Sequence, residues 1–170
     1  MKLTGFLPII APCSRVLILG SMPGVESLRQ QQYYAHPRNA FWLIMGELIG
    51  AQPEYDYTER VDVLRQNHIS LWDVLNSCVR PGSLDGDIER ASETVNPLLG
   101  FCREHSELRA LAFNGRKARE AFARHFLKKD PAFWQEFQLI DLPSTSPAYA
   151  SLRPASKLEI WRQRLWPVLF

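Results

Sequence analysis

The segment Tyr33–Trp42 gathers side chains that could carry chemistry: two tyrosines, a histidine, an arginine and Asn39, directly before an apolar stretch. A carboxamide cannot remove a proton, but it can orient a water molecule or donate a hydrogen bond. One interpretation of Asn39 is a helix cap. A cap does not explain the aromatic and basic side chains crowded beside it, so the segment predicts a binding or catalytic site.

A second unusual segment, Gly20–Gly24, reads Gly-Ser-Met-Pro-Gly and follows the apolar run Arg15–Leu19. Two interpretations stand side by side: a structural turn, or a loop that cradles a phosphate. The segment lacks the Gly-Lys-Ser/Thr ending of a Walker loop and the Gly-x-Gly-x-x-Gly pattern of dinucleotide-binding proteins. The common nucleotide-binding motifs are therefore excluded here.

The elements that must position these residues are predicted from apolar periodicity. Four strands are expected, at Arg15–Leu19, Ile69–Leu75, Arg109–Phe113 and Phe137–Leu142. Helices are expected at Val25–Gln32, Asn39–Ile49, Tyr57–Asn67, Thr94–Glu104 with Thr94 as cap, Gly115–Phe126 and Lys157–Leu165. A polar segment, Asn76–Asp87, follows the second expected strand. Strands alternating with helices predict an α/β fold, a three-layer α/β/α arrangement around a central, mostly parallel four-stranded sheet.

Ligands bind at the carboxyl ends of the strands in such folds. The segments that follow those ends are Gly20–Gly24, Asp73–Arg80, Asn114–Lys117 and Pro143–Ala148. Taken alone, Asp73 and Asn114 could also serve as turn or cap residues. The unusual residues of the chain nevertheless gather where a ligand is expected.

Bulk properties set wide bounds. A chain of 170 residues with 46% apolar content suits one domain over residues 1–170, and the net charge of +2 neither requires nor excludes a nucleic-acid partner. We expect a cytoplasmic monomer, because no signal peptide or membrane-spanning run is visible. We expect no metal and no cofactor, since Cys13, Cys78 and Cys102 lie far apart and no Cys/His cluster has metal-ligand spacing.

Gly20–Gly24 together with Tyr34–Trp42 (Tyr-Ala-His-Pro-Arg-Asn-Ala-Phe-Trp) resembles the first motif region of the uracil-DNA glycosylase superfamily, in particular its mismatch-specific branch. The Ser-Met-Pro version of the turn, paired with Leu142–Ala148, is more similar to the hypoxanthine-DNA glycosylase family. Weaker similarity runs through Ile69–Asp73 and Phe113–Ala118. The resemblance implies a uracil-DNA glycosylase-like fold, duplex DNA with a deaminated base as partner, and hydrolysis of an N-glycosidic bond without a cofactor.

Carried over residue by residue, the resemblance gives Asn39 the catalytic role, as the group that orients water or donates to the base. Met22 stands where relatives keep a water-activating Asp or Asn, and a thioether cannot hold or deprotonate water. Leu142 stands where other branches keep a histidine that stabilises uracilate. Both departures argue against efficient uracil excision. The expected base pocket comprises Gly20, Ser21, Met22, Pro23, Tyr34 as the stacking aromatic, His36, Asp73 as a reader of the base edge, and Asn114.

The expected DNA contacts are Arg38, Lys117, Ser144, Ser146 and Tyr149. Arg80, Arg116 and Arg153 could complete a basic rim, although surface charge is the ordinary interpretation of such residues. The first hypothesis is release of hypoxanthine from deoxyinosine in DNA. The alternatives are a glycosylase for mispaired uracil, thymine or xanthine, an inactive protein that binds lesions, and an unrelated α/β enzyme that binds a small phosphorylated ligand at Gly20–Gly24.

Overall fold

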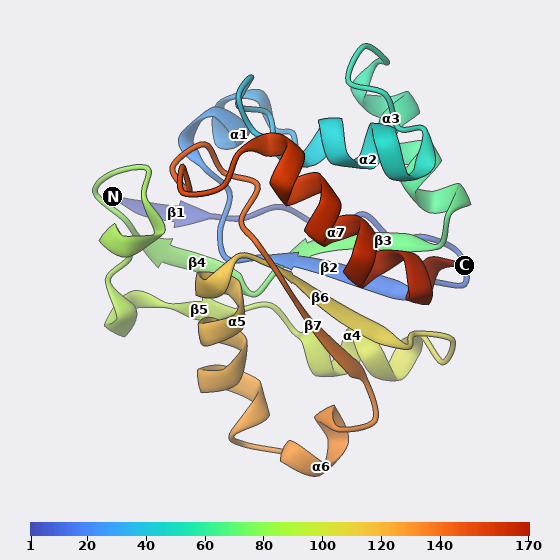
Figure 1. Ribbon diagram of the computed structural model, residues 1–170. Helices are drawn as coiled ribbons and strands as arrows, with labels where there is room; N and C mark the ends of the chain where they lie inside the picture. The colour runs from blue at the N-terminus through green and yellow to red at the C-terminus, as the bar shows by residue number, and fades with distance from the viewer.

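A parallel four-stranded sheet forms the centre of the computed structural model, which describes residues 1–170 (Figure 1). Its strands are β2 (Val16–Gly20), β3 (Ile69–Asp73), β6 (Ala110–Asn114) and β7 (Gln138–Leu142), in the spatial order β3-β2-β6-β7. All neighbouring pairs are parallel. The predicted sheet is confirmed.

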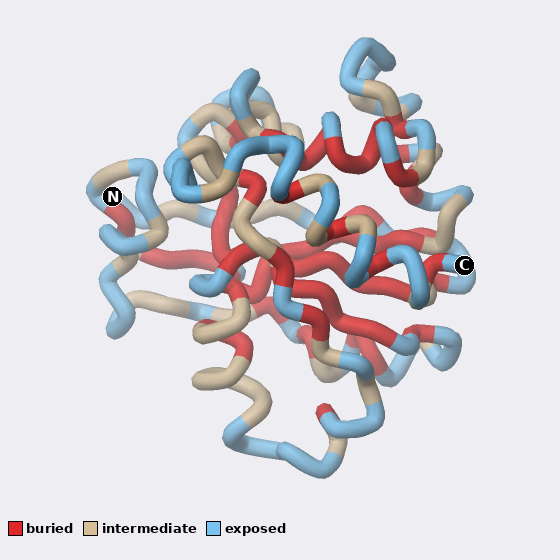
Figure 2. Tube along the Cα trace, in the orientation of Figure 1, coloured by how far each residue is buried: buried red, intermediate tan, exposed pale blue.

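Helices cover both faces of this sheet, which confirms the three-layer arrangement (Figure 1). On one face lie α2 (Phe41–Ile49), α3 (Tyr57–Gln66) and α7 (Pro154–Leu169), and on the other α4 (Leu98–Glu104), α5 (Arg116–Phe122) and α6 (Pro131–Trp134). Successive residues of a strand point to opposite faces, so Val16 and Ile18 enter one core while Leu17 and Leu19 enter the other. Burial on both faces explains why the central strand β2 is buried throughout, whereas β7 at the edge of the sheet has exposed Gln138 and Asp141 (Figure 2).

The strand order places a ligand-binding crevice beside β2. Because β2 lies between β3 and β6, the chain leaves it toward one neighbour and later returns to the other. Loops on the two sides of such a switch point diverge and leave a crevice at the carboxyl ends of the strands. The loop that follows β2 leads into α1 (Val25–Gln30) and contains the Gly20–Gly24 turn.

A second, antiparallel sheet was not predicted. It comprises β1 (Lys2–Thr4), β4 (Leu75–Val79) and β5 (Thr94–Val95), in the order β1-β4-β5. The expected strand Ile69–Leu75 was wrong, since β3 ends at Asp73 and Leu75 already belongs to β4. Every residue from Ile69 to Leu75 is buried, Asp73 included, so the pattern of burial continues across the break. Asn76–Asp87 likewise contains strand at its start and a 3-10 turn at Asp85–Asp87.

Several predicted helix ends differ from the structure. Thr94 does not cap a helix: its hydroxyl pairs with Ser77 across the second sheet at 2.7 Å, and α4 begins only after Pro97. The helix expected over Gly115–Phe126 ends at Phe122 and continues as a π turn, Ala123–Leu127. Four other helices differ at their ends: α1 ends at Gln30, α2 begins at Phe41, α3 ends at Gln66, and α7 extends beyond Lys157–Leu165 in both directions. No helix is both long and apolar enough to cross a bilayer.

Candidate active site

A cleft of about 800 Å³ opens at the carboxyl ends of the parallel strands. Every residue predicted for the site lines this cleft: Gly20, Ser21, Met22, Pro23, Tyr34, His36, Arg38, Asn39, Asp73, Asn114, Lys117, Ser144, Ser146 and Tyr149. They come from five separate parts of the chain. The fold therefore brings the two segments that carry the resemblance into one site.

Asn39 lies at the start of α2 with its carboxamide oriented by the helix. Its Oδ1 accepts a hydrogen bond from the Phe41 backbone N–H at 3.0 Å, and its own N–H donates to the His36 carbonyl at 2.8 Å. Asn39 is not the helix cap, because the N-cap of α2 is Ala40 and makes no side-chain hydrogen bond; the Asn39 oxygen instead closes a local turn just before the helix. The Nδ2 group donates to no protein acceptor, and the side chain lines the cleft. Asn39 therefore presents hydrogen-bond donors to whatever occupies the cleft.

The backbone of Tyr34 is held in the left-handed region, which residues other than glycine rarely adopt, with a φ of +56°. Its ring stacks on Phe41 at a centroid distance of 4.0 Å and also lines the cleft. Trp42 fixes the neighbouring backbone by donating to the Tyr33 carbonyl at 3.0 Å. Backbone strain of this kind persists only where the surrounding structure imposes it. At Tyr34 the strained backbone places the aromatic ring at the wall of the cleft.

Asp73 ends β3 and is almost completely buried at the floor of the cleft. A Cβ on Gly20 would overlap Asp73 Oδ1 and lie 3.3 Å from the Tyr34 hydroxyl, so glycine is required for this close approach. Burial above all, and then the nearby Asp85 carboxylate, raises the pKa of Asp73 to about 8, against the opposing charge of Arg80. Asp73 is therefore a neutral acid at pH 7. Its Oδ2 is buried without a hydrogen-bond partner, an arrangement that a polar ligand would satisfy.

Asn114 ties two walls of the cleft together. Its Nδ2 donates to Thr145 Oγ1 and its Oδ1 accepts from the Thr145 N–H, both at 2.9 Å. Thr145 also accepts from the Ala40 N–H at 3.0 Å, next to Asn39. With both ends of its carboxamide engaged, Asn114 fixes the loop after β7 relative to the start of α2. Sequence reasoning did not identify Thr145, because nothing in the local sequence distinguishes a buried loop threonine from an exposed one.

His36 and Met22 are less available to a ligand than their positions in the sequence suggest. His36 Nδ1 accepts from the Arg38 N–H at 3.1 Å, which leaves Nε2 to carry the proton in the neutral ring. Met22 borders the cleft, but its side chain is buried in the apolar cluster with Leu17 and Leu19. Neither side chain is a strong candidate for holding a water molecule.

Arg80, expected on the surface rim, is buried instead. Its Nη2 donates to the Pro23 carbonyl at 2.7 Å and its Nε to the Gly82 carbonyl at 3.0 Å. Nη1 has no hydrogen-bond partner and lies 3.9 Å from Asp85 Oδ1. Asp85 in turn accepts from the Ser21 hydroxyl at 2.5 Å. Sequence reasoning missed Asp85, because a short loop with three polar residues looks like an ordinary turn.

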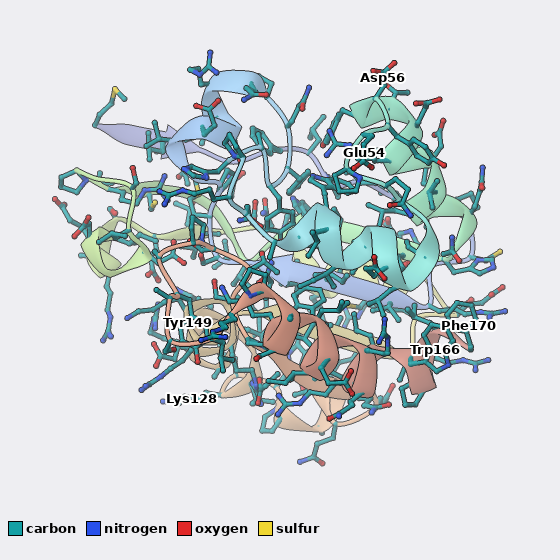
Figure 3. The ribbon with its side chains drawn as sticks, turned by 45° about the horizontal axis from the view of Figure 1, so that its top comes forward. Glu54, Asp56, Lys128, Tyr149, Trp166 and Phe170 are labelled. Carbon is teal, nitrogen blue, oxygen red and sulfur yellow. The ribbon has the colours of Figure 1, made fainter.

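Basic side chains lie at the outer edge of the cleft. Arg38, Arg116 and Lys117 are exposed there, whereas Arg153 does not line it. The loop after β7 rests on Lys157, whose buried ammonium donates to the Ser146 carbonyl at 3.0 Å and lies 5.3 Å from the centre of the Tyr149 ring. Figure 3 shows Tyr149 projecting from this loop. Cations together with an exposed aromatic ring suit a nucleic-acid backbone.

Comparisons with known proteins agree with this geometry. A model of the uracil DNA glycosylase superfamily matches residues 7–169. A hypoxanthine DNA glycosylase of Methanosarcina barkeri is 39% identical over 121 residues, covering 71% of this chain and 75% of the relative. A protein of the same name from Methanosarcina acetivorans is 40% identical over 117 residues, covering 68% and 73%.

The fold is shared as well. The solution structure of a Methanosarcina acetivorans protein, described as a candidate uracil DNA glycosylase, superposes with a TM-score of 0.76 at 34% identity, over 96% of this chain and 98% of that one. The family model spans nearly the whole sequence, and the relatives match in both sequence and structure. The chain therefore belongs to the uracil-DNA glycosylase superfamily of DNA glycosylases.

Proposed function

We propose that the protein hydrolyses the N-glycosidic bond of deoxyinosine in duplex DNA, releasing hypoxanthine and leaving an abasic site. The observation that carries this proposal is that one cleft combines the donor group of Asn39, the Tyr34 ring and the neutral acid Asp73. The two relatives named hypoxanthine DNA glycosylase support the same choice of base.

Asp73 suits the edge of hypoxanthine that carries N1–H and O6. A neutral carboxylic acid offers one O–H donor and one acceptor oxygen, and the base offers the complementary donor and acceptor side by side. Oδ2, which has no partner in the free protein, would gain one. Normal adenine is protected by its pairing, because flipping costs least for a mispaired base.

Asn39 serves the departure of the base. Cleavage of a glycosidic bond passes through an oxocarbenium-like state in which negative charge develops on the leaving group. An N–H donor aimed at the departing base lowers the free energy of that state. The Phe41 backbone holds the carboxamide oxygen, so the amide nitrogen is the end left for the base.

A panel of duplex oligonucleotides tests the proposal. Each duplex carries a single deoxyinosine, deoxyuridine, deoxyxanthosine or mispaired thymidine, and base release is followed by alkaline cleavage at the abasic site. We expect release from deoxyinosine to be fastest and release from adenine in the same context to be absent. A preference for uracil would overturn the choice of base. Tight, salt-sensitive binding without any abasic product would overturn the enzymatic assignment in favour of an inactive lesion-binding protein.

A further inference from the structure

Hydrolysis requires a water molecule at the sugar, and three carboxylates line the cleft that could hold it: Glu26, Asp73 and Asp85. Glu26 binds Arg29, with Nη2 to Oε1 at 2.6 Å and Nε to Oε2 at 3.0 Å. Hydrogen bonds from Arg29 and then Gln30 lower the pKa of Glu26 to about 2, which makes it a weak base. Asp73 is already protonated at neutral pH. Only Asp85 remains.

Asp85 is fixed in place by one of its two oxygens. The Ser21 hydroxyl donates to Oδ2, which anchors the short Asp85–Asp87 turn to the Gly20–Gly24 segment. Oδ1 accepts no hydrogen bond from the protein and lies 3.9 Å from Arg80 Nη1. That nitrogen is itself buried and unpartnered. A water molecule that accepts from Arg80 and donates to Asp85 would satisfy both groups.

A small polar cavity adjoins the cleft at this point. Its volume is about 90 Å³, and four residues line both spaces: Ser21, Asp85, Gly86 and Lys117. Polar cavities of this size hold ordered water. A water molecule held in this cavity would lie beside Asp85, at the border with the cleft.

Resting on the function proposed above, we propose that Asp85 is the residue that orients the attacking water and accepts its proton. The water oxygen forms a bond to C1′ of the deoxyribose while the C1′–N9 bond breaks, and the electron pair of that bond leaves with the base. One water proton passes to Asp85, which releases it to solvent after cleavage, and the hypoxanthine anion takes up one proton from solvent to give the free base. Asp85 thereby does what the buried thioether of Met22 cannot do.

The charged groups around Asp85 are compatible with this role. Burial raises the pKa of Asp85 from its ordinary value, against the hydrogen bond from Ser21 and the charges of Arg80 and Lys117. Asp73 faces it as a neutral acid. The other charged side chains of the small cavity are Arg90, Glu93, Glu120 and Arg124, of which Glu93 pairs with Arg124 at 2.7 Å.

Single-turnover base release from a deoxyinosine duplex tests the assignment, with Asp85→Asn and Asp85→Ala compared with wild type. Asp87→Asn, on the exposed side of the same turn, is the matched control. We expect release to be about 100-fold slower in both Asp85 variants, the lower end of general-base effects, with DNA affinity within about threefold of wild type. The fall in rate toward acid pH, where Asp85 takes up a proton, should be absent from Asp85→Asn. Added formate should restore part of the Asp85→Ala rate by replacing the lost carboxylate.

A rate within about twofold of wild type in Asp85→Asn would overturn the assignment of Asp85. A slower Asp85→Ala that formate does not rescue, with an unchanged pH profile in Asp85→Asn, would also overturn it, since a purely structural role predicts that result. The proposed function has its own test, independent of the Asp85 variants: it is wrong if the wild-type protein releases no hypoxanthine. If wild type prefers another base, the same variants are assayed on that base, and the same outcomes decide the role of Asp85.

Discussion

At the scale of single residues, the site depends on which end of a polar group remains free. The helix start engages the oxygen of Asn39 and leaves its donor, whereas Asn114 has both ends engaged by Thr145. Two asparagines that look equally functional in the sequence therefore have different tasks. The sequence predicted that both asparagines line the cleft. Which of their side-chain atoms lack a hydrogen-bond partner depends on the folded contacts, such as the one between Asn114 and Thr145.

Asp73 predicts an alkaline limit to activity. Above a pKa of about 8 the acid ionises, loses its O–H donor and repels O6 of the base. We expect the single-turnover rate on deoxyinosine to fall as pH rises through that value, an alkaline fall that is separate from the fall toward acid pH assigned to Asp85. Asp73→Asn keeps one donor and one acceptor, so its rate should be within about tenfold of wild type at pH 7 and show no alkaline fall. Rate profiles from pH 6 to 9.5 measure this, and an identical fall in both proteins would exclude Asp73 as its source.

The same pKa predicts how stability changes with pH. An aspartate in the unfolded chain ionises near pH 4, whereas folded Asp73 keeps its proton up to about pH 8. The folded state therefore binds more protons in that interval, and the stability contribution of Asp73 falls as pH rises from about 4 to 8. We expect Asp73→Asn to match wild type near pH 4 and to exceed it by up to about 5 kcal/mol at pH 8.5, because each unit of pKa difference is worth about 1.4 kcal/mol. Urea unfolding at the two pH values tests this, and a constant difference between the proteins would refute it.

At the scale of elements, apolar periodicity was enough to predict the parallel sheet and the helices on its faces. It failed where one buried run serves two sheets, at Asp73–Leu75, and where a side chain pairs across strands, as Thr94 does with Ser77. Within the site, the prediction that failed is the surface position of Arg80, which is buried. Its burial depends on carbonyl groups of the Gly20–Gly24 turn and its own loop, which no local pattern reveals.

The pairing of Asn114 with Thr145 predicts that loop position and activity are coupled. Asn114→Ala removes both hydrogen bonds and should cost about 1–3 kcal/mol of unfolding free energy. It should also slow base release, because the loop after β7 loses its fixed distance to α2. Asn67→Ala is the control, since it removes a 2.8 Å helix-end hydrogen bond outside the cleft. Denaturation and single-turnover assays decide, and equal activity in the two variants would contradict the coupling.

At the scale of the whole molecule, a net charge of only +2 suffices for DNA binding if the basic groups are concentrated at the cleft. Arg38, Arg116 and Lys117 stand at its edge, while Lys128 is exposed and does not line the cleft. Each phosphate contact contributes about 0.9 to the slope of log affinity against log salt. Lys117→Ala should lower that slope by about one, and Lys128→Ala should leave it unchanged. Fluorescence anisotropy across a salt series measures both, and an equal change in both would argue against a localised rim.

The fold places Asn39 in the cleft with its carboxamide oxygen hydrogen-bonded to the Phe41 N–H and its amide nitrogen without a protein partner. The rate of base release by Asn39 variants tests this arrangement most directly. Asn39→Asp is the informative change, because a carboxylate still accepts from the Phe41 N–H and preserves the helix start but has no N–H to offer. Under single-turnover conditions on a deoxyinosine duplex, we expect Asn39→Asp and Asn39→Ala to release hypoxanthine about 100- to 1000-fold more slowly than wild type, with DNA affinity nearly unchanged for Asn39→Ala. A rate within about tenfold of wild type in either variant would contradict the role of Asn39 as donor to the departing base.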